Sequence, residues 1–315
     1  MAEQAGPPVD GFVALLDGMQ AGLDPEILKE SAYSRGINVS CRGGLLRSRP
    51  GFVHDLELPA GAFQGMASWA LHSGARLVLV IGGSVCVVRA DDSSLQVFSG
   101  LLSATAQCYL CQAERFMVIQ DGSSTPVVLQ ENGGVVEVRP QAHTIPVGTA
   151  MTFAHGRLHL TPKYVPGGAE NGQPYVVSGD IFNPQNPASC LEFTETDYLS
   201  EGGAHSLPME MGYVRAFAPL RNAPTGTGYG GTVVFAERGV SAFDFSVPRD
   251  EWKSTALSQV LFFGPGTKSP WSVIPVNGTL LYRAVDGLRL LSYSVTSARS
   301  TGDILSMVPQ STEVS

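Results

Sequence analysis

The sequence predicts an all-β fold, and the composition and an internal repeat are the two observations behind this prediction. Charged residues make up 15% of the chain, which contains 36 glycines and 21 prolines among its 315 residues. Such a composition is typical of many short strands joined by turns rather than of long charged helices. From about Gly61 onward, a unit of an apolar strand, a glycine-containing turn and a second strand recurs. We therefore predict a β-propeller that follows a short N-terminal helix and a hairpin.

The recurring unit has the spacing expected of propeller blades. Five apolar residues mark its clearest copies: Leu77, Met117, Leu158, Val233 and Leu280. The steps between successive markers are 40, 41, 75 and 47 residues. Propeller blades repeat about every 40–50 residues. The step of 75 residues therefore requires an insertion, or a sixth blade between Pro174 and Leu207. Two stacked sandwiches are the alternative architecture, but they do not need such even spacing.

Composition divides the chain into three parts. Residues 1–60 are predicted to be an N-terminal arm with a short helix and an arginine-rich hairpin. Residues 61–299 are predicted to be the propeller, with an insertion near residues 161–207. Residues 300–315 are predicted to be a polar C-terminal tail, with Ile304, Leu305 and Val308 as its apolar anchors.

The predicted helix of the arm begins at Asp24-Pro25-Glu26. Asp24 is an N-cap residue, Pro25 suits the first helical position, and Glu26 suits the positive end of the helix dipole. We therefore predict a helix from Asp24 to Tyr33.

The stretch that follows the helix is predicted to be a β-hairpin around Gly43-Gly44, because two adjacent glycines tolerate the positive φ of a tight turn. This turn implies four cross-strand pairs: Arg42 with Leu45, Cys41 with Leu46, Ser40 with Arg47, and Asn38 with Arg49. Cross-strand partners share a face. One face therefore carries the polar residues Asn38, Ser40, Arg42, Arg47 and Arg49. The other face carries Ile37, Val39, Cys41 and Leu46.

This polar face is the predicted interface. Between Lys29 and Arg49 there are five basic residues and one acid, so the window has a net charge of +4 in a chain of net charge −8. A solvated hairpin edge is one interpretation. A contact with another subunit or a portal protein is the other, with DNA phosphate as a lesser alternative, because the guanidinium fork suits carboxylate and phosphate alike. We assign five residues to the predicted interface: Arg42, Arg47, Arg49, Asn38 and Ser40.

The same stretch resembles a known protein family. The motif Asn-Val … Gly-x-Leu-x-x-Arg-Pro-Gly-Phe runs from Asn38 to Phe52, and a Gly-Leu-Asp-Pro helix start precedes it at Gly22. It is similar to the opening of the tail nozzle proteins of short-tailed phages, also called tail tubular protein B, and of the related packaged-DNA stabilisation proteins. The resemblance covers roughly residues 18–52 and implies a virion component with a β-propeller core and a six-fold ring below the portal.

The resemblance implies a structural role and no enzymatic activity. The expected function is a nozzle or adaptor ring that extends the DNA channel below the portal, with the portal and other tail proteins as partners. The expected location is the virion tail, assembled in the host cytoplasm. DNA is expected to pass through without sequence-specific binding, and the net charge of −8 fits a channel that repels phosphate.

Two other functions stay open. One is a propeller-type glycan- or receptor-binding domain, and the other is a propeller hydrolase. Trp69, Trp252 and Trp271 are spread over the repeats and can line a sugar site, although core packing is the commoner fate of tryptophan. Asp121 and Asp286 each precede a glycine between two strands, which favours hairpin turns over a pair of catalytic carboxylates.

The remaining motifs predict no metal, cofactor or catalytic site. Cys108 and Cys111 have CxxC spacing but no second ligand pair, and in a strand they face opposite sides. His155 and His159 lie on a predicted turn and strand, where their spacing does not suit a shared metal. The glycine-rich stretch of residues 225–231 lacks the Lys-Ser/Thr of a phosphate-binding loop and is predicted to be a long hairpin tip.

No targeting or membrane segment is expected. Residues 1–10 contain neither a basic nor an apolar region of a secretory signal, and the apolar runs are far shorter than a membrane span. The chain has five cysteines, an odd number without framework spacing, which favours a reducing environment.

Overall fold

The computed structural model of the chain is all-β. It describes residues 56–89, 91, 93–139, 144–162, 175–194, 204–225, 228–246, 251–252, 258–276 and 278–291, and five further strands. Four of those strands lie near the N-terminus: β1 (Gly18–Met19), β2 (Ala32–Tyr33), β3 (Val39–Arg42) and β4 (Leu45–Ser48). The fifth is β24 (Ile304–Val308). The chain divides into two compact units, Met1–Asp55 with Val308–Ser315, and Leu56–Met307.

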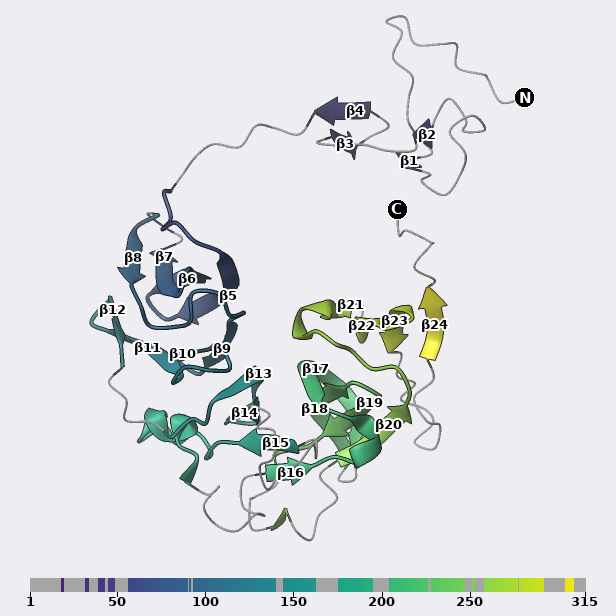
Figure 1. Ribbon diagram of the computed structural model, residues 1–315. Helices are drawn as coiled ribbons and strands as arrows, with labels where there is room; N and C mark the ends of the chain where they lie inside the picture. Colours follow the sequence, from purple (N-terminus) through teal and green to yellow (C-terminus); the bar gives the residue numbers. More distant parts are fainter. Residues whose placement is uncertain are drawn as a thin grey trace, which may run out of the picture. The chain divides into compact units, whose positions relative to one another are not determined.

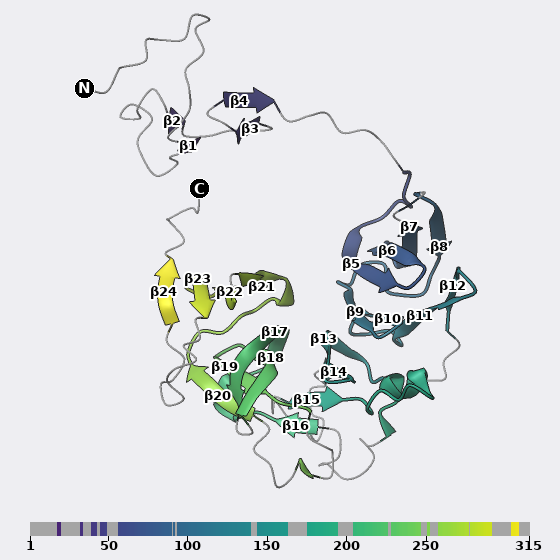
Figure 2. The same ribbon diagram turned by 180° about the vertical axis from the view of Figure 1, so that it is seen from behind.

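The larger unit is built from five four-stranded sheets, whose strands follow one another in chain order (Figures 1 and 2). The first sheet contains β5 (Phe63–Leu71), β6 (Gly74–Ile81), β7 (Ser84–Arg89) and β8 (Leu95–Phe98). The second contains β9 (Tyr109–Ala113), β10 (Phe116–Gln120), β11 (Val127–Asn132) and β12 (Val135–Val138). The third contains β13 (Gly148–Ala154), β14 (Arg157–Pro162), β15 (Tyr175–Ser178) and β16 (Ala204–Ser206).

The fourth and fifth sheets complete this unit. The fourth contains β17 (Val214–Thr225), β18 (Gly228–Ala236), β19 (Gly239–Phe243) and β20 (Ser258–Phe263). The fifth contains β21 (Val273–Val276), β22 (Thr279–Ala284), β23 (Gly287–Leu291) and β24. Three short 3₁₀ helices lie in the connections: η2 (Pro187–Leu191), η5 (Met209–Met211) and η7 (Pro270–Ser272).

The repeat found in the sequence corresponds to the sheets. Each of the five apolar markers lies in the second strand of a different sheet, on β6, β10, β14, β18 and β22. The long step between the third and fourth markers is an insertion. Its described residues hold β15, η2 and β16, which belong to the third sheet, so within the described part of this stretch there is no sixth sheet.

Successive sheets pack face to face, and the second strands β10 and β18 each contribute side chains to two apolar cores. On β10, Met117 and Ile119 belong to the core shared with the first sheet, whereas Phe116 and Val118 belong to the core shared with the third. Neighbouring residues of a strand point to opposite faces, so β10 is apolar on both faces from residue 116 to residue 119. The first strands of neighbouring sheets also contact each other along the series β5, β9, β13, β17 and β21.

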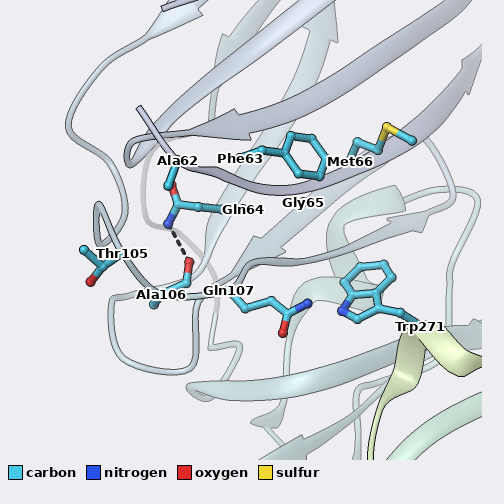
Figure 3. Close-up of a pocket in the computed structure, with 9 residues that line it drawn as sticks. All are labelled: Ala62, Phe63, Gln64, Gly65, Met66, Thr105, Ala106, Gln107 and Trp271. Carbon is cyan, nitrogen blue, oxygen red and sulfur yellow. Dashed lines mark hydrogen bonds between the residues drawn. The ribbon is translucent and has the colours of Figure 1, made fainter. Parts of the chain in front are cut away.

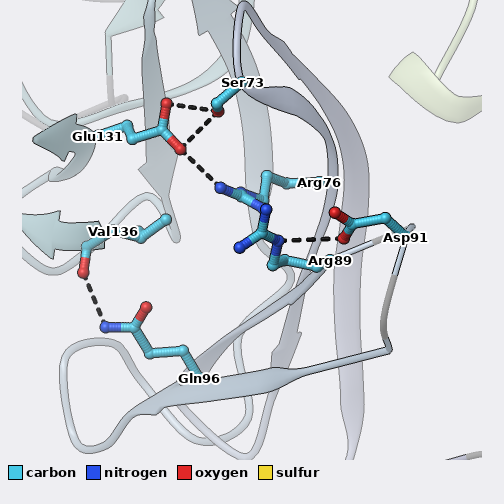
Figure 4. Close-up of polar contacts among 7 residues, drawn as sticks. All are labelled: Ser73, Arg76, Arg89, Asp91, Gln96, Glu131 and Val136. Carbon is cyan, nitrogen blue, oxygen red and sulfur yellow. Dashed lines mark hydrogen bonds and ion pairs between the residues drawn. The ribbon is translucent and has the colours of Figure 1, made fainter. Parts of the chain in front are cut away.

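Polar side chains also join the first sheet to the second (Figure 4). The side-chain guanidinium of Arg76, 2% exposed, reaches Glu131 across the sheet boundary with 2.6 Å between Nη2 and Oε1. The Ser73 hydroxyl donates to the same carboxylate at 2.6 Å. The amide of Gln96 on β8 donates to the carbonyl oxygen of Val136 on β12. These contacts fix the two sheets against each other.

The predicted hairpin is confirmed in the described residues. Strands β3 and β4 pair antiparallel in this register: Val39 with Ser48, Ser40 with Arg47, Cys41 with Leu46 and Arg42 with Leu45. The register places Ser40, Arg42 and Arg47 on one face, as the Gly43-Gly44 turn predicts. The predicted pair of Asn38 and Arg49 lies outside the described residues.

One prediction about the N-terminal arm needs correction. The helix predicted from Asp24 to Tyr33 does not extend to its predicted end, because Ala32–Tyr33 form β2 and pair in parallel with β1; the preceding residues lie outside the described part. At the other end of the chain, the tail predicted from its polar composition contains strand β24, which is the last strand of the fifth sheet. At Ala32–Tyr33, pairing with another strand outweighs the local propensity on which the helix prediction was based.

Candidate functional site

A cavity of about 480 Å³ lies between β5, the loop that leads into β9, and η7 (Figure 3). It is bordered by nine residues: Ala62, Phe63, Gln64, Gly65, Met66, Thr105, Ala106, Gln107 and Trp271. The first and second sheets thus contribute one side, and the connection into the fifth sheet contributes the other. This volume is within the range of about 300–1,000 Å³ typical of small-ligand sites.

Strand β5 exposes two large apolar side chains to the cavity. Phe63 is 60% exposed and Met66 is 55% exposed, whereas Gln64 and Gly65 between them are buried. The strand register shifts between Phe63 and Gly65, so β5 is irregular at this point. A bulge of this kind redirects the side chains on either side of it.

Gln64 fixes the loop that forms the neighbouring wall. Its buried side-chain amide donates to the carbonyl oxygens of Ser103 and Ala106, and its oxygen accepts from the backbone N–H of Gly83 at 2.6 Å. One side chain therefore ties β5, the β6–β7 turn and the loop before β9 together. Thr105 and Gln107 take their positions on the wall from this loop.

Gly65 allows β5 and β9 to approach closely. A Cβ atom at this position would lie 2.6 Å from the carbonyl oxygen of Cys108 and 2.9 Å from Cδ1 of Leu110. The backbone N–H of Cys108 donates to the carbonyl oxygen of Gln64 at 2.9 Å beside it. A side chain at position 65 is therefore incompatible with this wall of the cavity.

Trp271 forms the opposite wall on a well-anchored turn. The buried Thr267 hydroxyl contacts Ser272 Oγ at 2.7 Å and donates to the carbonyl oxygen of Arg283 at 3.1 Å. Ser269 caps η7 by accepting from the N–H of Trp271. Trp271 is 47% exposed, and its indole ring stacks on Tyr109, with 6.2 Å between ring centroids and 14° between planes.

The electrostatics around the cavity are close to neutral. None of its nine described lining residues carries an ionisable side chain. Burial raises the pKa of Tyr109, and the positive charge of Arg215 on β17 opposes that rise. Arg215 is itself ion-paired with Glu237 and lies 5.6 Å from the ring centroid of Tyr213. The cavity therefore offers aromatic faces, a thioether, an amide and a hydroxyl, a set suited to binding rather than to proton transfer.

A second, more open cavity of about 840 Å³ lies between the fourth and fifth sheets. Glu210, Glu237 and Arg238 line it together with Phe263, Gly264, Pro265 and Val285. Phe263 and Val285 are exposed there. Its charges are mixed, and its walls bring together no arrangement of side chains that defines a ligand.

The predicted interface residues are only partly covered by the structure. Ser40 and Arg42 lie on β3 and Arg47 lies on β4, whereas Asn38 and Arg49 are outside the described residues. The sequence did not predict the cavity as a whole. Of the three tryptophans considered for a sugar site, Trp69 and Trp252 are core residues and only Trp271 is exposed. The sequence signal that could have pointed to this cavity is the Ser-Pro-Trp stretch at the start of η7.

The cysteines and one histidine of the two motifs pack in or against the cores between the sheets, and the other histidine lies in a turn. Cys108 lies in the core between the first two sheets, whereas Cys111 packs on the core between the second and third, so the predicted opposite faces are confirmed. Burial raises the pKa of both thiols to about 12. His155 is in a turn, and His159 is buried on β14, where it contacts the hydroxyl of Ser178 at 2.7 Å.

The two Asp-Gly dipeptides and the glycine-rich stretch lie in hairpins, as predicted. Asp121-Gly122 connects β10 to β11. Asp286-Gly287 connects β22 to β23, and the carboxylate of Asp286 pairs with Arg289 at 2.5 Å. The glycine-rich stretch joins β17 to β18, and its glycines from Gly228 onward belong to β18.

Over the described ranges, no three His, Cys, Asp or Glu side chains are grouped as metal ligands. In the same part of the chain, none of the helices has the length and hydrophobicity of a membrane span.

Comparison with known proteins finds no matching family model and no match among curated proteins. Solved structures do show likenesses. One is the extracellular domain of a hybrid two-component system from B. thetaiotaomicron, with a TM-score of 0.43 and 10% identity, covering 73% of this chain and 26% of that one. The chain thus spans about a quarter of that structure.

Two further structures are similar at the same level. A protein assigned as a 6-phosphogluconolactonase from Bacteroides uniformis ATCC 8492 matches with a TM-score of 0.46 and 12% identity, covering 75% of this chain and 67% of that one. A nidogen/laminin complex matches with a TM-score of 0.40 and 10% identity, covering 75% and 78%. At these values the likenesses indicate no function for this chain.

Proposed function

We propose that this chain is a non-enzymatic structural protein of a phage tail, a nozzle or adaptor ring that extends the DNA channel below the portal. The observation that carries this proposal is the hairpin β3–β4, which has the register expected from the Gly43-Gly44 turn. It falls within the stretch from Asn38 to Phe52 that resembles the opening of tail nozzle proteins. In this proposal the face with Ser40, Arg42 and Arg47 contacts a neighbouring subunit or the portal.

We further propose that the five sheets are the blades of a β-propeller. Support comes from the strand order, which follows the chain within every sheet, and from the contacts between successive first strands. Each blade of a propeller packs on the next and places its first strand nearest the axis. Such a propeller is a stable scaffold for loops and hairpins that contact other subunits.

A ring is the assembly that this role requires. Head-to-tail contacts between identical subunits close into a cyclic oligomer when the rotation between neighbours closes. A basic hairpin on a chain of net charge −8 supplies one complementary half of such a contact. The overall negative charge disfavours binding of the DNA that passes through the ring.

Electron microscopy of the purified protein and of its parent particle tests the proposal. We expect ring-shaped oligomers in the purified sample and labelled copies of this chain below the portal in the particle. A protein that remains monomeric at every concentration tested, together with particles that lack it, would contradict the proposed function.

A further inference from the structure

We propose that the cavity between β5 and η7 is a binding site for a neutral saccharide. This inference goes beyond the tail role and does not depend on it, because it rests on the side chains around one cavity. Three properties of the site carry it: exposed aromatic faces, polar side chains without internal partners, and the absence of charge from its described walls.

The aromatic faces provide the apolar contact. Trp271 is backed on one side by Tyr109, so its ring is held in place while 47% of the residue stays exposed. Phe63 is exposed on the other side of the cavity, and Met66 lies next to it (Figure 3). A pyranose ring has one face of C–H groups, which packs on an aromatic ring, and an edge of hydroxyl groups, which requires hydrogen bonds. Large rigid rings supply contact area at little cost in side-chain entropy.

The polar side chains supply the hydrogen bonds. The side-chain amide of Gln107 points toward Trp271 (Figure 3). Three polar groups at the cavity make no hydrogen bond within the described part of the chain. They are this amide, the Thr105 hydroxyl and the indole N–H of Trp271. An amide both donates and accepts, so it can bind two adjacent hydroxyl groups of a sugar.

The lack of charge selects among sugars. The nine lining residues are all uncharged, and Arg215, which lies close enough to influence Tyr109, is ion-paired with Glu237. An acidic sugar, a sugar phosphate or a nucleotide would therefore lose hydration of its charge without gaining an opposite charge. A neutral saccharide meets no such penalty.

The walls are also held in place before any ligand binds. Gln64 fixes the loop of Thr105 and Gln107, and Thr267 fixes the turn of Trp271. Both anchors are buried. A preformed site needs less ordering on binding, so weak contacts with a small neutral ligand suffice for measurable affinity.

Calorimetric titration of the purified chain with three neutral trisaccharides, maltotriose, cellotriose and triacetylchitotriose, tests the proposal. We expect at least one to bind saturably with a Kd of about 1 mM or lower, and trigalacturonate to bind at least tenfold more weakly. Trp271→Ala should weaken binding at least tenfold and Trp271→Phe less, because phenylalanine keeps part of the stacking surface. Gln107→Leu should also weaken it while leaving the rings in place.

Phe263→Ala is the matched control, because Phe263 is exposed to a similar degree but lies at the second cavity. Its binding should equal that of the unaltered chain, and circular dichroism should show that all variants are folded. Failure of all three trisaccharides to bind the folded chain overturns the proposal. So does saccharide binding that Trp271→Ala and Gln107→Leu leave unchanged, or an equal preference for trigalacturonate. Because these measurements need no ring or particle, they are independent of the test of the tail role.

Discussion

At the scale of single residues, the buried carboxylate of Asp121 fixes two loops by hydrogen bonds. Asp121, buried at the end of β10, accepts hydrogen bonds from the N–H groups of Ser103, Ser123 and Ser124 and from the Ser124 hydroxyl. Burial by itself raises the pKa of this carboxyl group, but these hydrogen bonds outweigh burial and keep the pKa below its ordinary range. The ionised form of Asp121 therefore stabilises the fold.

Asp121→Asn is expected to destabilise the chain by about 2–3 kcal/mol at pH 7, because a charged acceptor of several hydrogen bonds is lost. The native pKa is lowered, so the contribution is complete above the ordinary value of 3.8 and declines as the pH falls below it. Urea unfolding of both chains from pH 7 to pH 3 should show a difference that narrows at the acidic end.

Asp91→Asn is the control, because Asp91 pairs with Arg89 at 3.0 Å on the surface, with 63% of its side chain exposed. It should change stability by no more than about 1 kcal/mol. A constant difference between the Asp121→Asn and unaltered chains across this pH range would contradict the assignment.

Arg76 and Glu131 form an ion pair whose side chains are 2% and 14% exposed. The Ser73 hydroxyl is the main cause that lowers the pKa of Glu131, and Arg76 adds to it. Glu131→Leu should destabilise the chain by about 3–5 kcal/mol, because the buried guanidinium then lacks its carboxylate. The double change Arg76→Met with Glu131→Leu should be less damaging than the sum of the two single changes. Urea unfolding of the four chains measures this coupling, and strict additivity would show that the pair is not coupled.

At the scale of elements, the β3–β4 hairpin carries the proposed contact face. Replacing Arg42, Arg47 and Arg49 together by alanine should leave the far-ultraviolet circular dichroism unchanged but impair ring formation. A desolvated pair between arginine and carboxylate costs about 2–5 kcal/mol when one partner is removed. Sedimentation velocity measures the oligomer. The exposed arginines Arg238 and Arg283 provide a control pair for alanine substitution.

Val39→Asp is expected to have the opposite effect, because it places a charge on the face without arginines and should damage the hairpin itself. Normal ring assembly by the triple alanine variant would mean that these arginines form only a solvated edge. The contact face would then have to lie elsewhere on the chain.

Strand β24 is expected to be needed for the fifth sheet, since it is the last of its four strands. Ending the chain after residue 302 should lower the melting temperature by about 2–4 °C for each kcal/mol lost, and should increase aggregation through the exposed edge of β23. Ending the chain after residue 309 leaves β24 intact and is the control. Equal thermal unfolding curves for the two truncated chains would show that β24 does not stabilise the sheet.

At the scale of the whole molecule, the net charge of −8 is expected to disfavour binding to nucleic acid. Fluorescence anisotropy of a labelled DNA duplex in 150 mM salt should not change up to about 100 μM protein, since non-specific DNA binders reach Kd values of about 10⁻⁴–10⁻⁶ M. Tighter binding that the triple arginine substitution removes would instead identify the hairpin as a phosphate contact.

The sequence by itself determined the features that depend on neighbouring residues. Apolar runs on the second strands revealed the five four-stranded sheets, because each of these strands packs in the core between neighbouring sheets, and β10 and β18 pack in two such cores. Gly43-Gly44 determined the register of β3 and β4, because a two-residue turn leaves only one way to pair the strands.

Only the tertiary structure decided the features that join distant parts of the chain. The pairing of β2 with β1 replaced the end of a helix that Asp24 and Pro25 favour locally, and β24 became a strand because β23 offers it a partner. The cavity joins Phe63 on β5 to Trp271 on η7, and nothing in the local sequence of either residue encodes their proximity. Local propensity acts over a few residues, whereas the packing of whole sheets brings such side chains together.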